Sequence, residues 1–224
     1  MNNGENYIEG ISQTVETQFG GGLSPINNDN SGTLKYVRVE YAGAAITGGT
    51  AEYNAFSFFG VGSGTVLENL QAYKGADDAF EFFGGAVNAT NLAAFGCEDD
   101  NIDWDRGYRG TLSNIWIIQP ANGDFGFECS NLPVEFNSSP RANPTVTNVT
   151  ITGSGNANKA AFNFKEGTAG NISNVKVTNV GYGVDLRNHP ELSNAGEFLK
   201  TFFKSMGSDD EDVLAPLLKY RMRH

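Results

Sequence analysis

The sequence is poor in the residues that most often carry cross-links or metals: its 224 residues include two cysteines and two histidines. His189 and His224 lie near the C-terminal end, so we expect no histidine or cysteine cluster that would bind zinc. Cys97 and Cys129 occupy different places in the repeat described below, which favours two free buried thiols over a disulfide bridge. No serine–histidine or cysteine–histidine pairing is apparent, so the sequence offers no activated nucleophile of that type.

Positive charge is also scarce, because the formal net charge is -11. The segment from Asp77 to Glu128 holds ten carboxylates and only two cations, Arg106 and Arg109. Nucleic acid is therefore excluded as a partner class, since a phosphate backbone requires clustered lysine and arginine. A metal cation or a neutral or basic ligand suits this charge, and a solvated acidic face that keeps the protein soluble is the equally weighted alternative.

Long apolar runs are absent, so the sequence predicts no membrane span. The first ten residues lack the basic and apolar regions of a signal peptide. If the protein is exported, we expect this sequence to be a mature or trimmed form.

A 22-residue unit is written twice in succession, as residues 64–85 and 86–107. The two copies align without a gap, so that Asn69 matches Asn91 and Glu81 matches Asp103. The composition, with 28 glycines and 16 phenylalanines, favours short strands joined by tight turns. A fixed period of this length without helical periodicity predicts a β-solenoid, in which each coil buries its apolar face against the next.

A shorter pattern, apolar-x-Asn-apolar-x-apolar, recurs along the chain with asparagine spacings of 22, 23, 34 and 26 residues. Its asparagines are Asn69, Asn91, Asn114, Asn148 and Asn174, and Tyr36 takes the same place in a sixth copy. The long spacing marks an insertion at 130–143. Because equivalent positions of a β-solenoid stack about 4.8 Å apart, we expect the amides to form a structural column of hydrogen bonds.

A second strand in each coil alternates apolar, polar and apolar residues. The triplets are Phe56–Phe58, Phe80–Phe82, Ile102–Trp104, Phe127–Cys129, Phe162–Phe164 and Val184–Leu186. Alternation points the outer members, Trp104 included, into an aromatic core and the middle member outward. The predicted solenoid spans residues 32–190, after an irregular N-terminal segment or partial first coil at 1–31.

The pattern changes in residues 191–224. Asn194 and Glu197 resemble a capping box at the start of an amphipathic helix over 195–206, and residues 213–224 read as a second helical stretch. Because an open solenoid end would pair with another chain, we expect a helical C-terminal cap. Self-association through this tail is the alternative.

The outward middle residues Glu81, Asp103 and Glu128 form the sharpest candidate site. Ionised carboxylates about 5 Å apart repel by roughly 1 to 3 kcal/mol, so the column needs a counter-charge, a shared proton or a metal ion. Calcium accepts six to eight oxygen ligands, and the acidic turns nearby supply more of them. The predicted metal ligands are Asp77, Asp78, Glu81, Asp99, Asp100 and Asp103.

The same column is the candidate for catalysis, with Glu81, Asp103, Glu128 and Arg106 as candidate catalytic residues. Paired carboxylates about 5 to 9 Å apart run glycoside hydrolysis, although any β-solenoid with outward acids meets that distance. Tyr73, Tyr108 and Arg109 are the candidates for a ligand shelf beside the turns, because sugar rings stack on exposed aromatic side chains.

The chain resembles a right-handed parallel β-helix of the pectate-lyase-like superfamily. The segments Gly32–Gly43 and Asp77–Gly85 resemble secreted or surface proteins of Bacteroidota, and the resemblance covers about residues 28–188. It implies a secreted or cell-surface location and no assured activity. Pectate lyases use calcium held by acidic residues and an arginine or lysine base, which Asp99, Asp100 and Asp103 with Arg106 or Arg109 suggest without completing a lyase motif. The histidine motif of polygalacturonases is absent from the coils.

These observations predict an all-β protein, a parallel β-helix of about six coils with a helical C-terminal cap. The expected function is non-catalytic binding of a polysaccharide or cell-surface component, with calcium as the one cofactor expected, in a structural role on the acidic face. The alternatives are a calcium-dependent polysaccharide lyase or glycoside hydrolase on the same face, and a structural or self-assembling surface module.

Overall fold

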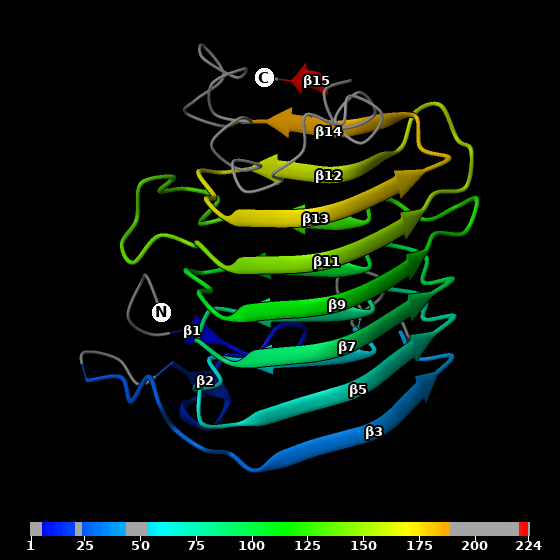
Figure 1. The fold of residues 1–224 in the computed structure, drawn as a ribbon. Helices are drawn as coiled ribbons and strands as arrows, with labels where there is room; N and C mark the ends of the chain where they lie inside the picture. Colours follow the sequence, from blue (N-terminus) through cyan, green and yellow to red (C-terminus); the bar gives the residue numbers. More distant parts are fainter. Residues whose placement is uncertain (1–5, 21–23, 44–52, 189–219, 224) are drawn as a thin grey trace.

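The computed structural model describes residues 6–20, 24–43, 53–188 and 220–223. Within these ranges the chain is almost entirely β-structure, and the one helical element is the 3₁₀ turn η1 (Val15–Thr17). Successive coils rise as a stack from β3 at one end to β13, β14 and β15 at the other (Figure 1). The prediction of an all-β parallel β-helix is confirmed.

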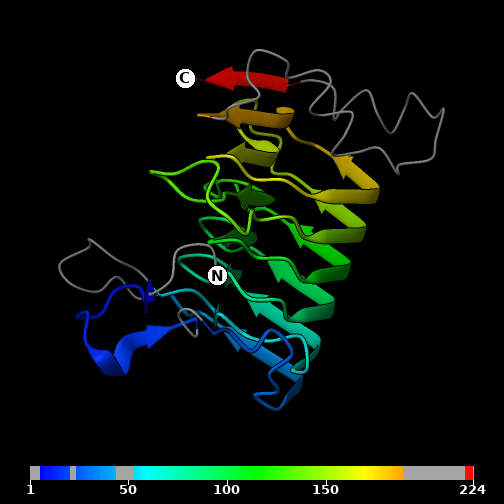
Figure 2. The ribbon, with the colours of Figure 1, turned by 90° about the vertical axis from the view of Figure 1, so that its left-hand side faces the viewer.

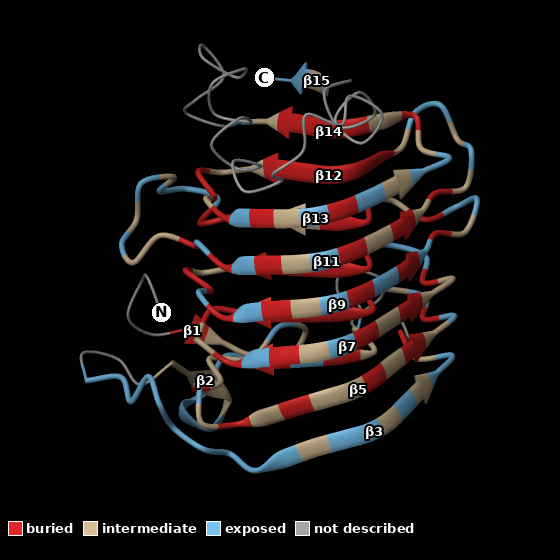
Figure 3. Cartoon of the chain, viewed as in Figure 1, coloured by how far each residue is buried: buried red, intermediate tan, exposed pale blue. Residues whose placement is uncertain are grey.

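Each coil adds one long strand to a six-stranded sheet and one short strand to a seven-stranded sheet, and every pairing within these two sheets is parallel. The long strands are β3 (Thr33–Glu40), β5 (Val66–Tyr73), β7 (Asn88–Phe95), β9 (Thr111–Ile118), β11 (Thr145–Thr152) and β13 (Asn171–Thr178). The short strands are β4 (Phe56–Phe59), β6 (Phe80–Phe83), β8 (Ile102–Asp105), β10 (Phe127–Cys129), β12 (Ala160–Lys165), β14 (Tyr182–Arg187) and β15 (Tyr220–Arg223). Buried and exposed segments line up from strand to strand, as expected for an in-register stack (Figure 3).

Each long strand bends at the residue predicted to stack. Tyr36 and the five column asparagines adopt left-handed backbone angles, with φ between +52° and +59°. Asparagine tolerates this conformation better than other non-glycine residues. Each later amide donates to the side-chain oxygen of the asparagine one coil earlier, for example Asn91 to Asn69 at 2.9 Å and Asn174 to Asn148 at 2.7 Å. The predicted structural column is confirmed.

The core is the predicted aromatic stack between the two sheets. Phe56 lies on Phe80 with ring centroids 4.9 Å apart, and Phe127 lies on Phe162 at the same separation. Trp104 is fully buried, and its indole N–H donates to the Thr168 hydroxyl at 2.9 Å. Cys97 and Cys129 are free and buried, as favoured by the sequence.

In the described part of the N-terminal segment, residues 6–20 and 24–31, no strand joins the parallel sheets. β1 (Asn6–Tyr7) and β2 (Gln18–Phe19) pair with each other in an antiparallel hairpin beside the coils formed early in the chain (Figure 2). Phe19 packs edge-on against Phe59 and Phe83, and Asn6 accepts a hydrogen bond from Arg106 at 3.0 Å. These contacts fasten the hairpin to the outer side of the seven-stranded sheet.

The prediction of a helical stretch over residues 213–224 is wrong for the four residues of it that the structure describes before His224. Residues 220–223 form strand β15, paired in parallel with β14, and are not part of a helix. Strand pairing satisfies the exposed edge of β14 directly, which a helix lying over the coil would not do. The helix predicted at 195–206 and the remainder of the tail lie outside the described residues.

Candidate functional site

One outward position of the seven-stranded sheet carries a charged or polar side chain on every strand. The register aligns Ser57, Glu81, Asp103, Glu128, Asn163, Asp185 and Arg221 from β4 to β15. From β4 to β14 their neighbours in sequence are buried residues of the core, so this column lies on the opposite face of the sheet. The column runs from acidic on β6, β8 and β10 to basic on β15.

The expectation of a solvated acidic face is wrong for this part of the column. Glu81 is 8% exposed and Asp103 is 9% exposed. Glu81 also accepts a hydrogen bond from the Asn54 amide. Alternation along a strand predicts which side a residue faces, but it does not predict what covers that side. The carboxylates are therefore removed from most of the solvent that would have screened their repulsion.

Three groups of carboxylates bring their oxygens within 4.8 Å of one another. They are Asp77–Asp78–Asp99, Asp78–Glu81–Asp103 and Asp100–Asp103–Glu128. All six predicted metal ligands belong to these groups. We refer to Asp78, Glu81, Asp100, Asp103 and Glu128 as the acidic cluster.

Asp103 is shared by two of these groups, and its Oδ1 atom is buried without a hydrogen-bond partner. A buried carboxylate oxygen with no donor lacks the compensation that buried polar atoms normally receive. The donor set consists only of oxygen atoms, which is the set that calcium prefers. The residues present therefore fit a calcium ion.

Two members of the cluster also bind backbone. Asp78 accepts a hydrogen bond from the Asp100 N–H at 2.9 Å, and Asp100 accepts one from the Phe125 N–H at 2.6 Å. Equivalent aspartates thus join each acidic turn to the next coil. This structural role leaves the second oxygen of each carboxylate for the cluster.

Burial raises the pKa of Asp78, Glu81, Asp100 and Asp103 well above the ordinary range, and neighbouring carboxylates raise it further. The main neighbour is Asp103 for Glu81 and Glu128 for Asp103. Burial likewise raises the pKa of Asp105 to about 7, although Arg106 opposes the shift. Without a cation, the cluster therefore holds protons at pH values where exposed carboxylates are ionised.

Two cations pair with carboxylates in or next to the acidic cluster. Arg106 pairs with Asp105 at 3.0 Å, whereas the side chain of Arg109 is exposed. Lys165, from β12, pairs with Glu128 at 2.7 Å, and this pairing raises the pKa of the lysine. Lys165 was not predicted as a site residue, although it follows the recognised Phe162–Phe164 triplet directly. It extends the site across the insertion that separates β10 from β12.

The predicted ligand shelf is not assembled. Tyr108 is fully buried, stacks on Phe82 and donates its hydroxyl hydrogen to the Val87 carbonyl at 2.8 Å. Tyr73 is half-buried on β5, with the Arg38 guanidinium 4.5 Å from its ring centroid. The two tyrosines therefore do not form one surface, because Tyr108 turns into the core.

Exposed aromatic side chains lie on the other sheet. Tyr36 is 82% exposed and Trp116 is 53% exposed, on β3 and β9 of the six-stranded sheet. Trp116 contacts Phe95 edge-on, with ring centroids 5.0 Å apart, which fixes the indole. It borders a shallow depression of about 350 Å³ lined by Asn114, Ile115, Trp116, Asn148 and Thr150. An exposed, oriented indole beside polar side chains suits stacking of a flat apolar ring face.

In the described part of the chain, no helix has both the length and the hydrophobicity needed to cross a membrane. Searches among curated proteins and among solved structures found no match. A family model described as "Pectate-lyase like beta helix domain" matches residues 1–210, in agreement with the stacked parallel sheets. The chain therefore belongs to the pectate-lyase-like β-helix family.

Proposed function

We propose that this protein is a non-catalytic, extracytoplasmic β-helix that binds glycans and is stabilised by calcium in the acidic cluster. The observation that carries the calcium assignment is the shared position of Asp103, with a buried and unpartnered Oδ1 between two groups of carboxylates. A divalent cation supplies the missing partner and removes the repulsion between the carboxylates. The extracytoplasmic location rests on the family resemblance.

The ligands would come from three successive coils. Glu81, Asp103 and Glu128 occupy equivalent positions of β6, β8 and β10, and Asp78 and Asp100 come from the preceding turns. An ion held by all three coils would add a side-chain link between strands that already pair through their backbones. The expected role is therefore stabilisation of the stack.

A structural role is better supported than a catalytic one. A reacting sugar must touch the carboxylates, and Glu81 and Asp103 are only 8% and 9% exposed. Arg106, the candidate base, is held by Asp105 and Asn6. These contacts favour a buried site that stabilises the protein over a site that is open to a substrate.

The test is thermal unfolding in chelator and in millimolar calcium. We expect calcium to raise the melting temperature of the protein by several degrees and Asp103→Asn to abolish that rise. Glu135→Gln is the matched control, because Glu135 is exposed and lies outside the cluster. An unchanged melting temperature in the parent, or equal shifts in the parent and Asp103→Asn, would reject the calcium site.

The glycan-binding part of the proposal is supported by the surface around Trp116. Affinity electrophoresis in gels containing neutral and acidic polysaccharides tests it. We expect retardation by at least one polymer, lost in Trp116→Ala and kept in Ile118→Ala, which changes a 39% exposed residue on the same strand. Migration unaffected by every polymer, or equal retardation of both variants, counts against a Trp116 site.

A polysaccharide lyase or glycoside hydrolase is the second candidate. It is favoured by the closeness of Glu81 and Asp103, whose carboxylate oxygens lie within 4.8 Å, and by their raised pKa values, which suit a general acid. Release of unsaturated or reducing ends from the same polysaccharides, abolished by Asp103→Asn, would establish this candidate. It would also replace the non-catalytic proposal.

A further inference from the structure

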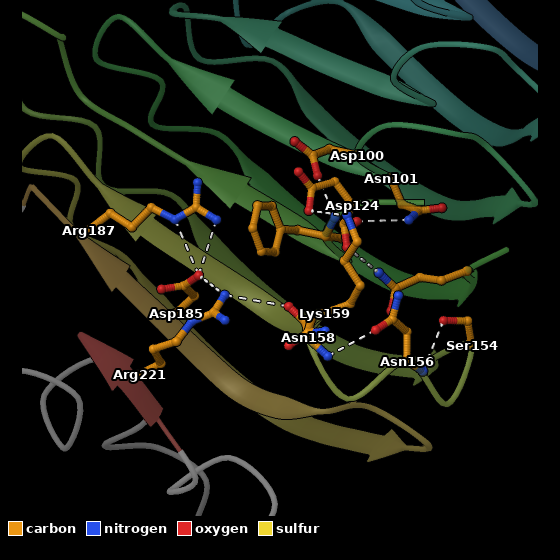
Figure 4. Close-up of polar contacts among 12 residues, drawn as sticks. Asp100, Asn101, Asp124, Ser154, Asn156, Asn158, Lys159, Asp185, Arg187 and Arg221 are labelled. Carbon is orange, nitrogen blue, oxygen red and sulfur yellow. Dashed lines mark hydrogen bonds and ion pairs between the residues drawn. The ribbon is translucent and has the colours of Figure 1, made fainter. Parts of the chain in front are cut away.

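The last strands of the seven-stranded sheet carry a compact group of arginines. Arg187 lies on β14, and Arg221 and Arg223 lie on β15, where the register aligns Arg221 with Asp185 and Arg223 with Arg187. All three point a guanidinium nitrogen at the same atom, Oδ2 of Asp185. The distances are 3.1 Å from Arg187, 2.5 Å from Arg221 and 3.2 Å from Arg223. Figure 4 shows Arg187 and Arg221 meeting at Asp185 from two neighbouring strands.

The charges in this group do not balance. Among the described residues, Asp185 is the one carboxylate within ion-pair distance of the three arginines. Three guanidinium groups and one carboxylate leave two positive charges. Lys165, which the register aligns with Arg187, pairs with Glu128, so that carboxylate does not neutralise the arginines. The arginines repel one another, and a ligand with two negative charges would offset that repulsion.

The three arginines also offer more N–H donors than Asp185 can accept. Each guanidinium offers five N–H donors, and Asp185 Oδ2 accepts only a few of them. The Nε atom of Arg221 is buried without a partner. The side chains of Arg187, Arg221 and Arg223 are 29%, 22% and 43% exposed, so an anion can reach the group from solvent. Asp185 Oδ1 is also buried without a partner, so the case for a further acceptor rests on the number of donors: three guanidinium groups offer more N–H groups than one carboxylate can accept.

Aromatic rings hold two of the guanidinium groups in place. The Arg187 guanidinium lies 4.9 Å from the Phe125 ring centroid, and the Arg221 guanidinium lies 4.7 Å from that of Tyr182. Stacking fixes the guanidinium plane and leaves its edge for hydrogen bonds. Such pre-organised forks match the oxygen spacing of an oxyanion.

We propose that Arg187, Arg221 and Arg223 form a binding site for a divalent tetrahedral oxyanion, sulfate or phosphate. The excess of two positive charges matches the charge of such an ion, and the convergent guanidinium edges supply its hydrogen bonds. The site lies at the basic end of the column whose acidic end holds the carboxylate cluster, and it does not depend on calcium or glycan binding.

Isothermal titration calorimetry with sodium sulfate tests the proposal. The titration is done at about pH 7.5, where all three arginines are charged, and sodium chloride keeps the ionic strength constant. We expect one saturable site for sulfate, and at least tenfold weaker binding in both Arg223→Gln and Arg221→Gln. A parallel titration with phosphate shows which dianion is preferred. Monovalent acetate should bind at least tenfold more weakly than the preferred dianion.

Arg38→Gln is the matched control, because Arg38 is a 46% exposed arginine on the other sheet, and it should bind sulfate like the parent. Arg223→Lys is a second test in case the glutamine variants fail to fold. It keeps the positive charge but loses the two-pronged guanidinium donor, so we expect its affinity for sulfate to lie between those of the parent and Arg223→Gln. Heat that does not saturate, equal affinity in all variants, or equal affinity for acetate and sulfate would each overturn the proposal.

Discussion

Both sheets place similar side chains at equivalent positions of successive coils, but the interactions between those side chains differ. On the six-stranded sheet, asparagines repeat from coil to coil and each amide donates to the previous one. On the seven-stranded sheet, carboxylates repeat at Glu81, Asp103 and Glu128. Burial, and after it the neighbouring carboxylates, raises the pKa of Glu81 and Asp103, and Glu128 pairs with Lys165. An amide carries both a donor and an acceptor, so a column of amides satisfies itself, whereas ionised carboxylates carry only acceptors.

The carboxylate column therefore depends on something that the amide column does not need. A proton, a calcium ion or a cationic side chain must be added at each step, and Lys165 and Arg106 supply only part of that charge. The basic end of the same face shows the reverse imbalance, at Arg187, Arg221 and Arg223. These two imbalances of charge are the reason that we propose an ion-binding site at each end of this face.

The largest effect is expected from breaking the amide column. Asn114→Val removes a hydrogen bond to Asn91 and another from Asn148, and places a β-branched residue at φ +58°. We expect a loss of about 3 kcal/mol in the free energy of unfolding, measured in urea. Asn114→Gly separates the causes, because glycine accepts the backbone angle, and should cost only about 1 to 2 kcal/mol. Equal losses in both variants would mean that the backbone angle contributes nothing.

The next effect is a pH dependence that arises from the buried carboxylates of the seven-stranded sheet, Asp105 included. Groups with a raised folded-state pKa bind more protons folded than unfolded, so their contribution to stability is complete below the unfolded pKa and is lost as pH rises through the folded pKa. For Asp105 this window runs from 3.8 to about 7. In chelator we expect the free energy of unfolding to fall on the order of 2 kcal/mol between about pH 5 and about pH 8.

Calcium should reverse this trend, because it binds the ionised carboxylates and competes with protons. Urea unfolding at both pH values, with and without calcium, measures the difference. A protein in chelator that gains stability over the same pH range would show that the buried carboxylates are already ionised in the folded state.

A smaller effect is expected when the carboxylates of the seven-stranded sheet are replaced by amides like those of the asparagine column. The double variant Glu81→Gln/Asp103→Asn replaces two buried carboxylates by amides that keep an acceptor, including the one that Asn54 uses. In chelator we expect a gain of roughly 1 kcal/mol in unfolding free energy, because the repulsion is removed. The variant should also lose its response to calcium. Destabilisation in chelator would show instead that the carboxylates are paired in a way that amides cannot reproduce.

The smallest effect on stability is expected at the exposed aromatic surface. Trp116→Ala removes one edge-on contact with Phe95, made by a side chain that is 53% exposed. We expect less than about 1 kcal/mol change in unfolding free energy, measured as above. A larger loss would mean that the indole holds the sheet together and is not free to bind a ligand.

Sequence reasoning succeeded where the repeat itself carries the information. The asparagine column, the aromatic core and the inward position of Trp104 all follow from one period and one alternation, because stacking repeats each local environment coil after coil. It failed at Tyr108, since alternation along a strand does not extend through a turn. It also failed at residues 220–223, where a strand closes the seven-stranded sheet without belonging to the repeat.

The family, the parallel coils and the positions that stack could be predicted from the amino-acid sequence, because they depend on periodicity and on hydrogen bonding between neighbouring coils. The burial of the acidic cluster, the pairing of Lys165 with it and the convergence of three arginines on Asp185 became apparent only in the folded chain. Burial and charge balance depend on segments far apart in the chain that meet on one face, and no local pattern encodes which segments those are.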